Sequence, residues 1–220
     1  MTPDNFFFTE NDLAAYAVKH YNFTTHEGFN AGIWKNDNAT DNQAATDYDK
    51  KWIPGQWKVP EAYDNPASND PWYFSAIREA NYFLETVVPR FEKGEIEGSE
   101  TNIKHYIGEM YFLRAKNYLS KLETFGDFPI IKNTLPDESE SLIQASKRAP
   151  RYKVAHFILE DLDQAISLLT NNISGGKNRI TKNAALLLKS RAALFEASWL
   201  TYHKGTALVP GGPGWPGKAE

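Results

Sequence analysis

The 220-residue sequence contains no cysteine, no cluster of basic residues and no apolar run long enough to cross a membrane. The absence of cysteine excludes disulfides and thiol chemistry from these residues. A net charge of -4 with both signs interspersed gives no reason to expect a nucleic-acid partner or an anionic membrane surface. The first residues also lack the basic region and the apolar core of a signal peptide.

Patterns typical of metal sites and catalytic sites are missing as well. The five histidines show no ligand spacing, and neither a Ser/His/Asp arrangement nor a phosphate-binding glycine loop is present. Asp37, Asp41 and Asn42 could suggest a calcium loop, but the pattern lacks its glycine and its terminal glutamate. A solvated polar loop is the better interpretation, and no metal or cofactor is expected.

Glu160, Asp161 and Asp163 could be interpreted as paired catalytic carboxylates. Neighbouring positions on one helix point in different directions, so these side chains are expected to form a charged outer face. The sequence therefore gives these three carboxylates no catalytic role.

Apolar residues recur at helical spacing in several segments of the chain. Residues 109–125 predict a largely buried helix that ends at Gly126, before Pro129. A second segment, 181–205, repeats its Arg-Ala pair, aromatic-rich apolar run and terminal glycine, so Arg191 corresponds to Arg114. The repeat is weak, but it suggests helical hairpins of the tetratricopeptide type, at about 70–125 and 150–204.

Capping residues predict where further helices begin. Thr9 and Asp12 predict a short first helix, and Thr181 predicts the start of the last one. Asp70 and Pro71 predict the start of a helix that has Trp72 on its buried face and Pro89 at or near its end. Pro150 predicts the start of another helix, along residues 150–169. Residues 128–131 could form a short extended piece. The fold class expected is all-α.

A long segment of about 24–69 has no sustained periodicity and holds three tryptophans, Trp34, Trp52 and Trp57, among many Asn and Asp residues. An indole can stack on the flat face of a pyranose ring, while polar side chains such as Asp41 and Asn42 bind its hydroxyls. These five residues are the candidate ligand-binding residues. In the alternative interpretation the tryptophans only anchor the loop to the helices; Trp72 and Trp199 are expected in the core.

Four motifs in order carry a resemblance to a known family. They are WYFSAIREANYFLE at residues 72–85, EMYFLRAKNYLSKLETFGDFPII at 109–131, FILEDLDQAISLL at 157–169 and RITKNAALLLKSRAALFEASW at 179–199. In this order the motifs resemble the SusD/RagB family of outer-membrane glycan-binding lipoproteins. The resemblance covers most of the chain from Thr9 onward.

The resemblance implies a non-catalytic protein with tetratricopeptide-like helix pairs, lipid-anchored on the outer membrane at the cell surface. Such a protein binds an oligosaccharide or another large nutrient and delivers it to a SusC-like TonB-dependent transporter. No signal peptide or lipidated cysteine is present here, and family members are more than twice this length. We therefore expect residues 1–220 to be a single incomplete SusD-like domain.

Two other functions remain open from the residues alone. An intracellular tetratricopeptide scaffold would bind a peptide in a groove lined by its long helices. An α-helical glycoside hydrolase would need two carboxylates at a defined separation, and no such pair stands out.

Arg114 and Arg191 stand among apolar residues, where a guanidinium needs a carboxylate or carbonyl partner. We expect them to connect neighbouring helices through Glu109, Glu160 or loop carbonyls. Replacing Arg114 by Ala should lower the melting temperature without changing ligand specificity, measured by thermal unfolding beside a binding assay. An unchanged melting temperature would contradict this role.

Overall fold

The computed structural model describes residues 6–23, 39–40, 43–44, 53, 72–173 and 178–215. Its helices are α1 (Glu10–Lys19), α3 (Ser75–Glu92), α4 (Glu100–Phe125), α5 (Ser139–Ala145), α6 (Arg151–Leu168) and α7 (Lys182–Tyr202). Strands β1 (Ala39–Thr40) and β2 (Gln43–Ala44) pair antiparallel. The chain divides into two compact units: β1 and β2 belong to Tyr21–Glu61, and every described helix belongs to the other unit. The all-α prediction is confirmed.

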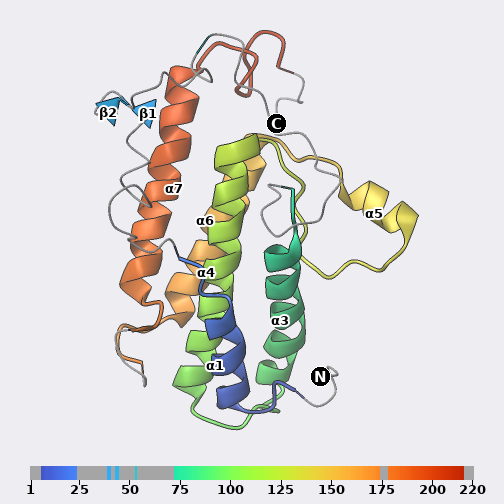
Figure 1. Ribbon diagram of the computed structural model, residues 1–220, viewed down its shortest axis with the longest axis vertical. Coiled ribbons are helices and arrows are strands. Elements are labelled where there is room, and N and C mark those ends of the chain that lie inside the picture. Colours follow the sequence, from blue (N-terminus) through green and yellow to red (C-terminus); the bar gives the residue numbers. More distant parts are fainter. Residues whose placement is uncertain are drawn as a thin grey trace. The chain divides into compact units, whose positions relative to one another are not determined.

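Helix α4 forms the centre of the helical unit, with α1, α3 and α6 packed against it (Figure 1). Its buried side chains include Ile103, Met110 and Tyr118 and are distributed around the helix rather than along one stripe. A helix that is apolar on most sides must be enclosed by neighbours. The predicted burial of residues 109–125 follows from this central position.

The predicted helix ends are mostly confirmed. Thr9 and Asp12 form a reciprocal capping box at the start of α1, and the Thr181 hydroxyl accepts a hydrogen bond from the amide of Ala184 in α7. Pro150 directly precedes α6. Gly126 ends α4 with a φ of 74°, which glycine adopts without the steric cost of a Cβ.

The prediction for α3 is wrong at its start, whereas Pro89 lies near its end as predicted. Asp70 and Pro71 lie outside the described residues, and the helix begins only at Ser75, so Trp72 precedes it and is partly exposed. Pro89 lies inside the helix, which continues to Glu92. A proline has no backbone N–H, so one helical hydrogen bond is missing at Pro89. The Pro89 carbonyl still accepts a hydrogen bond from the amide of Lys93 at 3.2 Å, beyond the proline.

The segment after α4 also differs from its prediction. Instead of an extended piece along 128–131, the structure has a single antiparallel bridge between Phe128 and Ala149. The following polar stretch contains the short helix α5, which buries none of its residues. A helix of this length gave no periodic pattern to detect.

Helix α7 is much more exposed than the repeat suggested. Leu187 is 72% exposed and Leu194 is 69% exposed. Arg191 is also exposed, so its predicted structural role is not supported, and Trp199 is only half-buried. Because α7 packs mainly against α6, only one of its faces is covered within the described residues.

No helix in the described part of the chain combines the length and the apolar character that a membrane span requires.

Gly108 explains how closely α6 approaches α4. A Cβ at this position would lie 3.0 Å from Cγ of Leu169 and 3.1 Å from Cβ of Leu168, at the end of α6. Glycine costs about 1 kcal/mol relative to alanine inside a helix. The close contact between the two helices is the physical reason for a glycine here.

Replacing Gly108 by Leu should destabilise the fold by about 1–3 kcal/mol, because the added side chain forces the two helices apart. Urea unfolding followed by circular dichroism measures the change. Ser120→Leu, at an exposed position of the same helix, is the matched control and should change stability by less than about 0.5 kcal/mol. Equal stability of the two variants would show that the close approach is unimportant.

Candidate functional site

All five candidate ligand-binding residues, Trp34, Asp41, Asn42, Trp52 and Trp57, lie outside the described residues. In the sequence, Asp41 and Asn42 stand between the paired strands β1 and β2, where Ala39 pairs with Ala44 and Thr40 with Gln43. Their assignment as ligand-binding residues stays a prediction. The helical unit shows which other polar side chains the fold brings together.

Arg114 of α4 lies at the centre of a buried polar cluster. Its Nε and Nη2 atoms each donate to one carboxylate oxygen of Asp161 on α6, both at 2.7 Å. Nη1 donates to the Asn81 side-chain oxygen at 2.9 Å and to the Lys132 carbonyl at 3.3 Å. Burial raises the pKa of the Asp161 carboxyl, and the two guanidinium bonds oppose that rise.

This arrangement corrects two predictions. Asp161 is buried and paired, whereas Glu160 and Asp163 are exposed as expected of an outer face. Arg114 binds a loop carbonyl, that of Lys132, as predicted, but its carboxylate partner is Asp161 and not Glu109 or Glu160. Asp161 faces α4 because it lies three residues, about one turn, after Ile158 and so shares the buried face of α6.

The segment 131–134 is held in place by side chains from the helices. The Asn81 amide donates to the Ile131 carbonyl at 2.8 Å, and the Tyr118 hydroxyl both accepts from the Ile131 amide at 2.8 Å and donates to its carbonyl at 3.2 Å. Glu85 accepts from the amide and hydroxyl of Thr134. Burial raises the pKa of Tyr118 to about 12, so its hydroxyl stays protonated at neutral pH. A segment without secondary structure is thereby fixed in one path.

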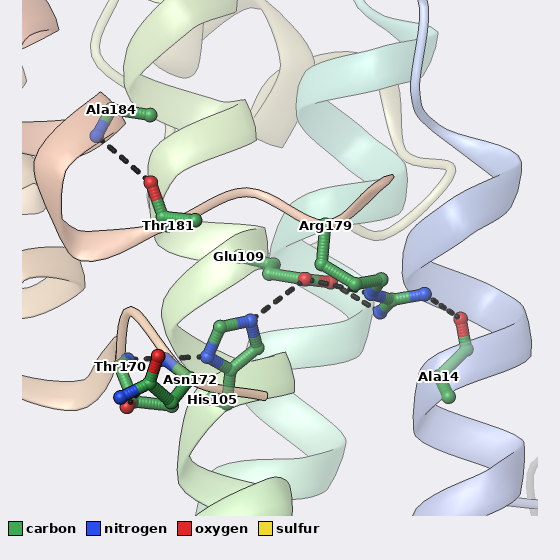
Figure 2. Close-up of polar contacts among 8 residues, drawn as sticks. All are labelled: Ala14, His105, Glu109, Thr170, Asn172, Arg179, Thr181 and Ala184. Carbon is green, nitrogen blue, oxygen red and sulfur yellow. Dashed lines mark hydrogen bonds and ion pairs between the residues drawn. The ribbon is translucent and has the colours of Figure 1, made fainter. Parts of the chain in front are cut away.

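Figure 2 shows a second buried cluster, in which His105 and Arg179 both contact Glu109. The amide of Thr170 donates to His105 Nδ1 at 3.2 Å, so Nδ1 is unprotonated and Nε2 carries the proton that it donates to Glu109 at 3.1 Å. Arg179 also donates to the Ala14 carbonyl at 3.3 Å. One carboxylate is balanced by one guanidinium beside a neutral imidazole, which fits a structural link between α1, α4 and residue 179.

A third pair, Arg151 on α6 and Glu196 on α7, joins the last two helices at 2.8 Å. The Arg151 guanidinium lies 4.0 Å from the centre of the Trp199 ring. Three buried atoms here, Arg151 Nη2, Glu196 Oε1 and Trp199 Nε1, have no hydrogen-bond partner within the described residues.

None of these clusters has the composition of a metal site. Among the residues that the structure describes, no group of three or more His, Cys, Asp or Glu side chains could hold a metal ion. The carboxylates of the clusters are each paired with a guanidinium.

A pocket of about 360 Å³ lies on the helical unit between the first turn of α3 and the segment 129–146. Its walls are mainly apolar side chains, among them Phe74, Ile77, Ile131 and Leu142, with Arg78 beside them. One wall is the fixed segment that includes Ile131, so the pocket is preformed. Sequence patterns gave no indication of it, because its residues come from separate elements.

The comparisons with known proteins agree on one family. The family model for SusD-like proteins, described as starch-binding and associating with the outer membrane, matches residues 2–194. Among curated proteins, no match is found.

Solved structures give the same result. A SusD-like protein from Bacteroides fragilis is 26% identical with a TM-score of 0.65, and the match covers 89% of this chain and 37% of that chain. A SusD-like carbohydrate-binding protein from the same species is 16% identical with a TM-score of 0.58, covering 90% of this chain and 39% of that chain, and shows the shared fold. The chain therefore spans less than two fifths of the length of the solved relatives it matches.

Replacing Asp161 by Ala should destabilise the fold by about 3–5 kcal/mol, because it leaves the Arg114 guanidinium buried without a counter-charge. Chemical unfolding measures the loss. Glu160→Ala, which removes the exposed carboxylate next in sequence, is the matched control and should change stability by less than about 0.5 kcal/mol. If the two variants were equally stable, the buried pair would not support the fold.

Proposed function

This chain belongs to the SusD-like family of outer-membrane-associated, carbohydrate-binding proteins, and we propose that it captures oligosaccharides at the cell surface for uptake. The observation that carries the proposal is the family match from residue 2 to residue 194, nearly the whole chain. The tetratricopeptide-like helical fold, shared with a 26% identical SusD-like structure, supports it.

SusD-like proteins bind carbohydrate without catalysing a reaction on it. Capture would therefore rely on stacking of sugar rings against aromatic side chains and on hydrogen bonds from polar neighbours. We assign these roles to Trp34, Trp52 and Trp57 and to Asp41 and Asn42. Each subsite binds one sugar ring with modest affinity, and several subsites together raise the affinity for the oligosaccharide.

The finer part of the proposal concerns delivery. The captured oligosaccharide passes to a SusC-like TonB-dependent transporter, and a lipid anchor outside these residues holds the protein at the outer membrane. We also propose that residues 1–220 form part of one longer SusD-like domain, in line with the share of the solved relatives that the match covers. The comparisons offer no support for an intracellular peptide-binding scaffold.

Replacing both Trp52 and Trp57 by Ala should weaken oligosaccharide binding about tenfold or more, which corresponds to about 1.4 kcal/mol, because two stacking surfaces are lost. Isothermal titration with a panel of polysaccharides measures the affinity, and circular dichroism checks that the helices remain intact.

The control is Trp215→Ala, because Trp215 lies outside the 24–69 segment and contacts Tyr152. It should leave affinity unchanged. Full binding by the Trp52/Trp57 double variant would contradict the assignment of the loop, and failure of the wild-type protein to bind any polysaccharide in the panel would contradict glycan capture itself.

A further inference from the structure

The apolar pocket on the helical unit is built before any ligand arrives. Asn81 and Tyr118 hold Ile131 through three hydrogen bonds of 2.8–3.2 Å, and Ile131 forms part of one wall. The opposite wall comes from α3, where Ile77 is 1% exposed. A cavity of about 360 Å³ lies in the range of small-molecule sites, roughly 300–1,000 Å³.

The lining selects an apolar body in preference to a sugar. Ile131, Leu135 and Leu142 present aliphatic surface that offers sugar hydroxyls no hydrogen bonds, and besides Arg78 the polar lining residues are Asn81, Asn133 and Ser146. The indole of Trp72 is engaged by the protein itself: its centroid is 4.0 Å from that of Phe125, and the Arg148 guanidinium lies 4.8 Å over the ring. Trp72 therefore serves as a wall rather than as a platform for a pyranose.

Two cationic groups stand beside this apolar lining. Arg78 lines the pocket and is exposed, so its guanidinium lies at the boundary with solvent. Arg148, also exposed, lies over Trp72, another lining residue. Within the part of the chain that the structure describes, no carboxylate forms an ion pair with either guanidinium. A guanidinium binds a carboxylate in a bidentate geometry, which makes an anionic group the natural complement.

We propose that this pocket binds a small amphipathic carboxylate, with its aromatic or aliphatic body against Ile131 and Leu142 and its carboxylate paired with Arg78, while Arg148 over Trp72 supplies a second positive charge beside the lining. Its lining residues are different from those assigned to oligosaccharide capture. It gives the protein a second ligand class, one recognised by apolar burial and charge.

Isothermal titration of the full chain with 3-phenylpropionate tests the proposal, with 3-phenyl-1-propanol as the uncharged analogue and decanoate as the aliphatic acid. The wild-type protein should bind at least one of the two acids saturably. If 3-phenylpropionate binds, its affinity should be at least tenfold higher than that of its alcohol. The Arg78→Met/Arg148→Met variant should weaken acid binding about tenfold and leave alcohol binding unchanged, because methionine keeps apolar bulk and loses the charge.

Arg191→Met/Lys204→Met removes two exposed charges elsewhere and should leave acid binding unchanged. Ser146→Phe, at an exposed lining position, should block binding of the acid and of the alcohol alike by filling the pocket.

Any of three results would overturn the proposal: no saturable binding of either acid, equal affinity for 3-phenylpropionate and its alcohol, or equal losses of acid binding in the two charge variants. Oligosaccharide binding should be the same in the Arg78→Met/Arg148→Met variant as in the wild type, so the two sites fail or succeed independently.

Discussion

The helical unit depends on the hydrogen bonds of the buried Arg114 guanidinium. A charge removed from water must replace its lost hydration with hydrogen bonds to protein groups. Arg114 does so with both oxygens of Asp161 on α6, the side chain of Asn81 on α3 and the carbonyl of Lys132. One side chain on the central helix thus fixes the positions of two neighbouring helices and of the segment that follows α4.

The same cluster connects the fold to the pocket. Asn81 accepts from Arg114 and donates to the Ile131 carbonyl, so the core interaction extends into the wall of the pocket. A loop held by buried side chains can present a binding surface without the entropic cost of ordering it. The apolar pocket is therefore a product of the polar core, even though its own lining is mostly aliphatic and aromatic.

Burial is uneven along the helical unit. Helix α4 is enclosed, whereas α7 exposes Leu187 and Leu194 on a face that no described residue covers. The solved relatives are more than twice as long as the match they share with this chain. The buried link between Arg151 and Glu196 holds α7 to α6, so its position does not rely on burial of that apolar face.

The sequence by itself determined the all-α class, the helix caps at Thr9, Gly126 and Thr181, and the family, because these depend on local spacing and on motifs in order. Only the tertiary structure decided that Asp161 is buried while Glu160 is exposed. Successive residues on a helix are rotated by about 100°, so adjacent carboxylates face different surroundings, and the position of α4 selects which one meets Arg114. The pocket likewise required the path of residues 131–134, which no local pattern encodes.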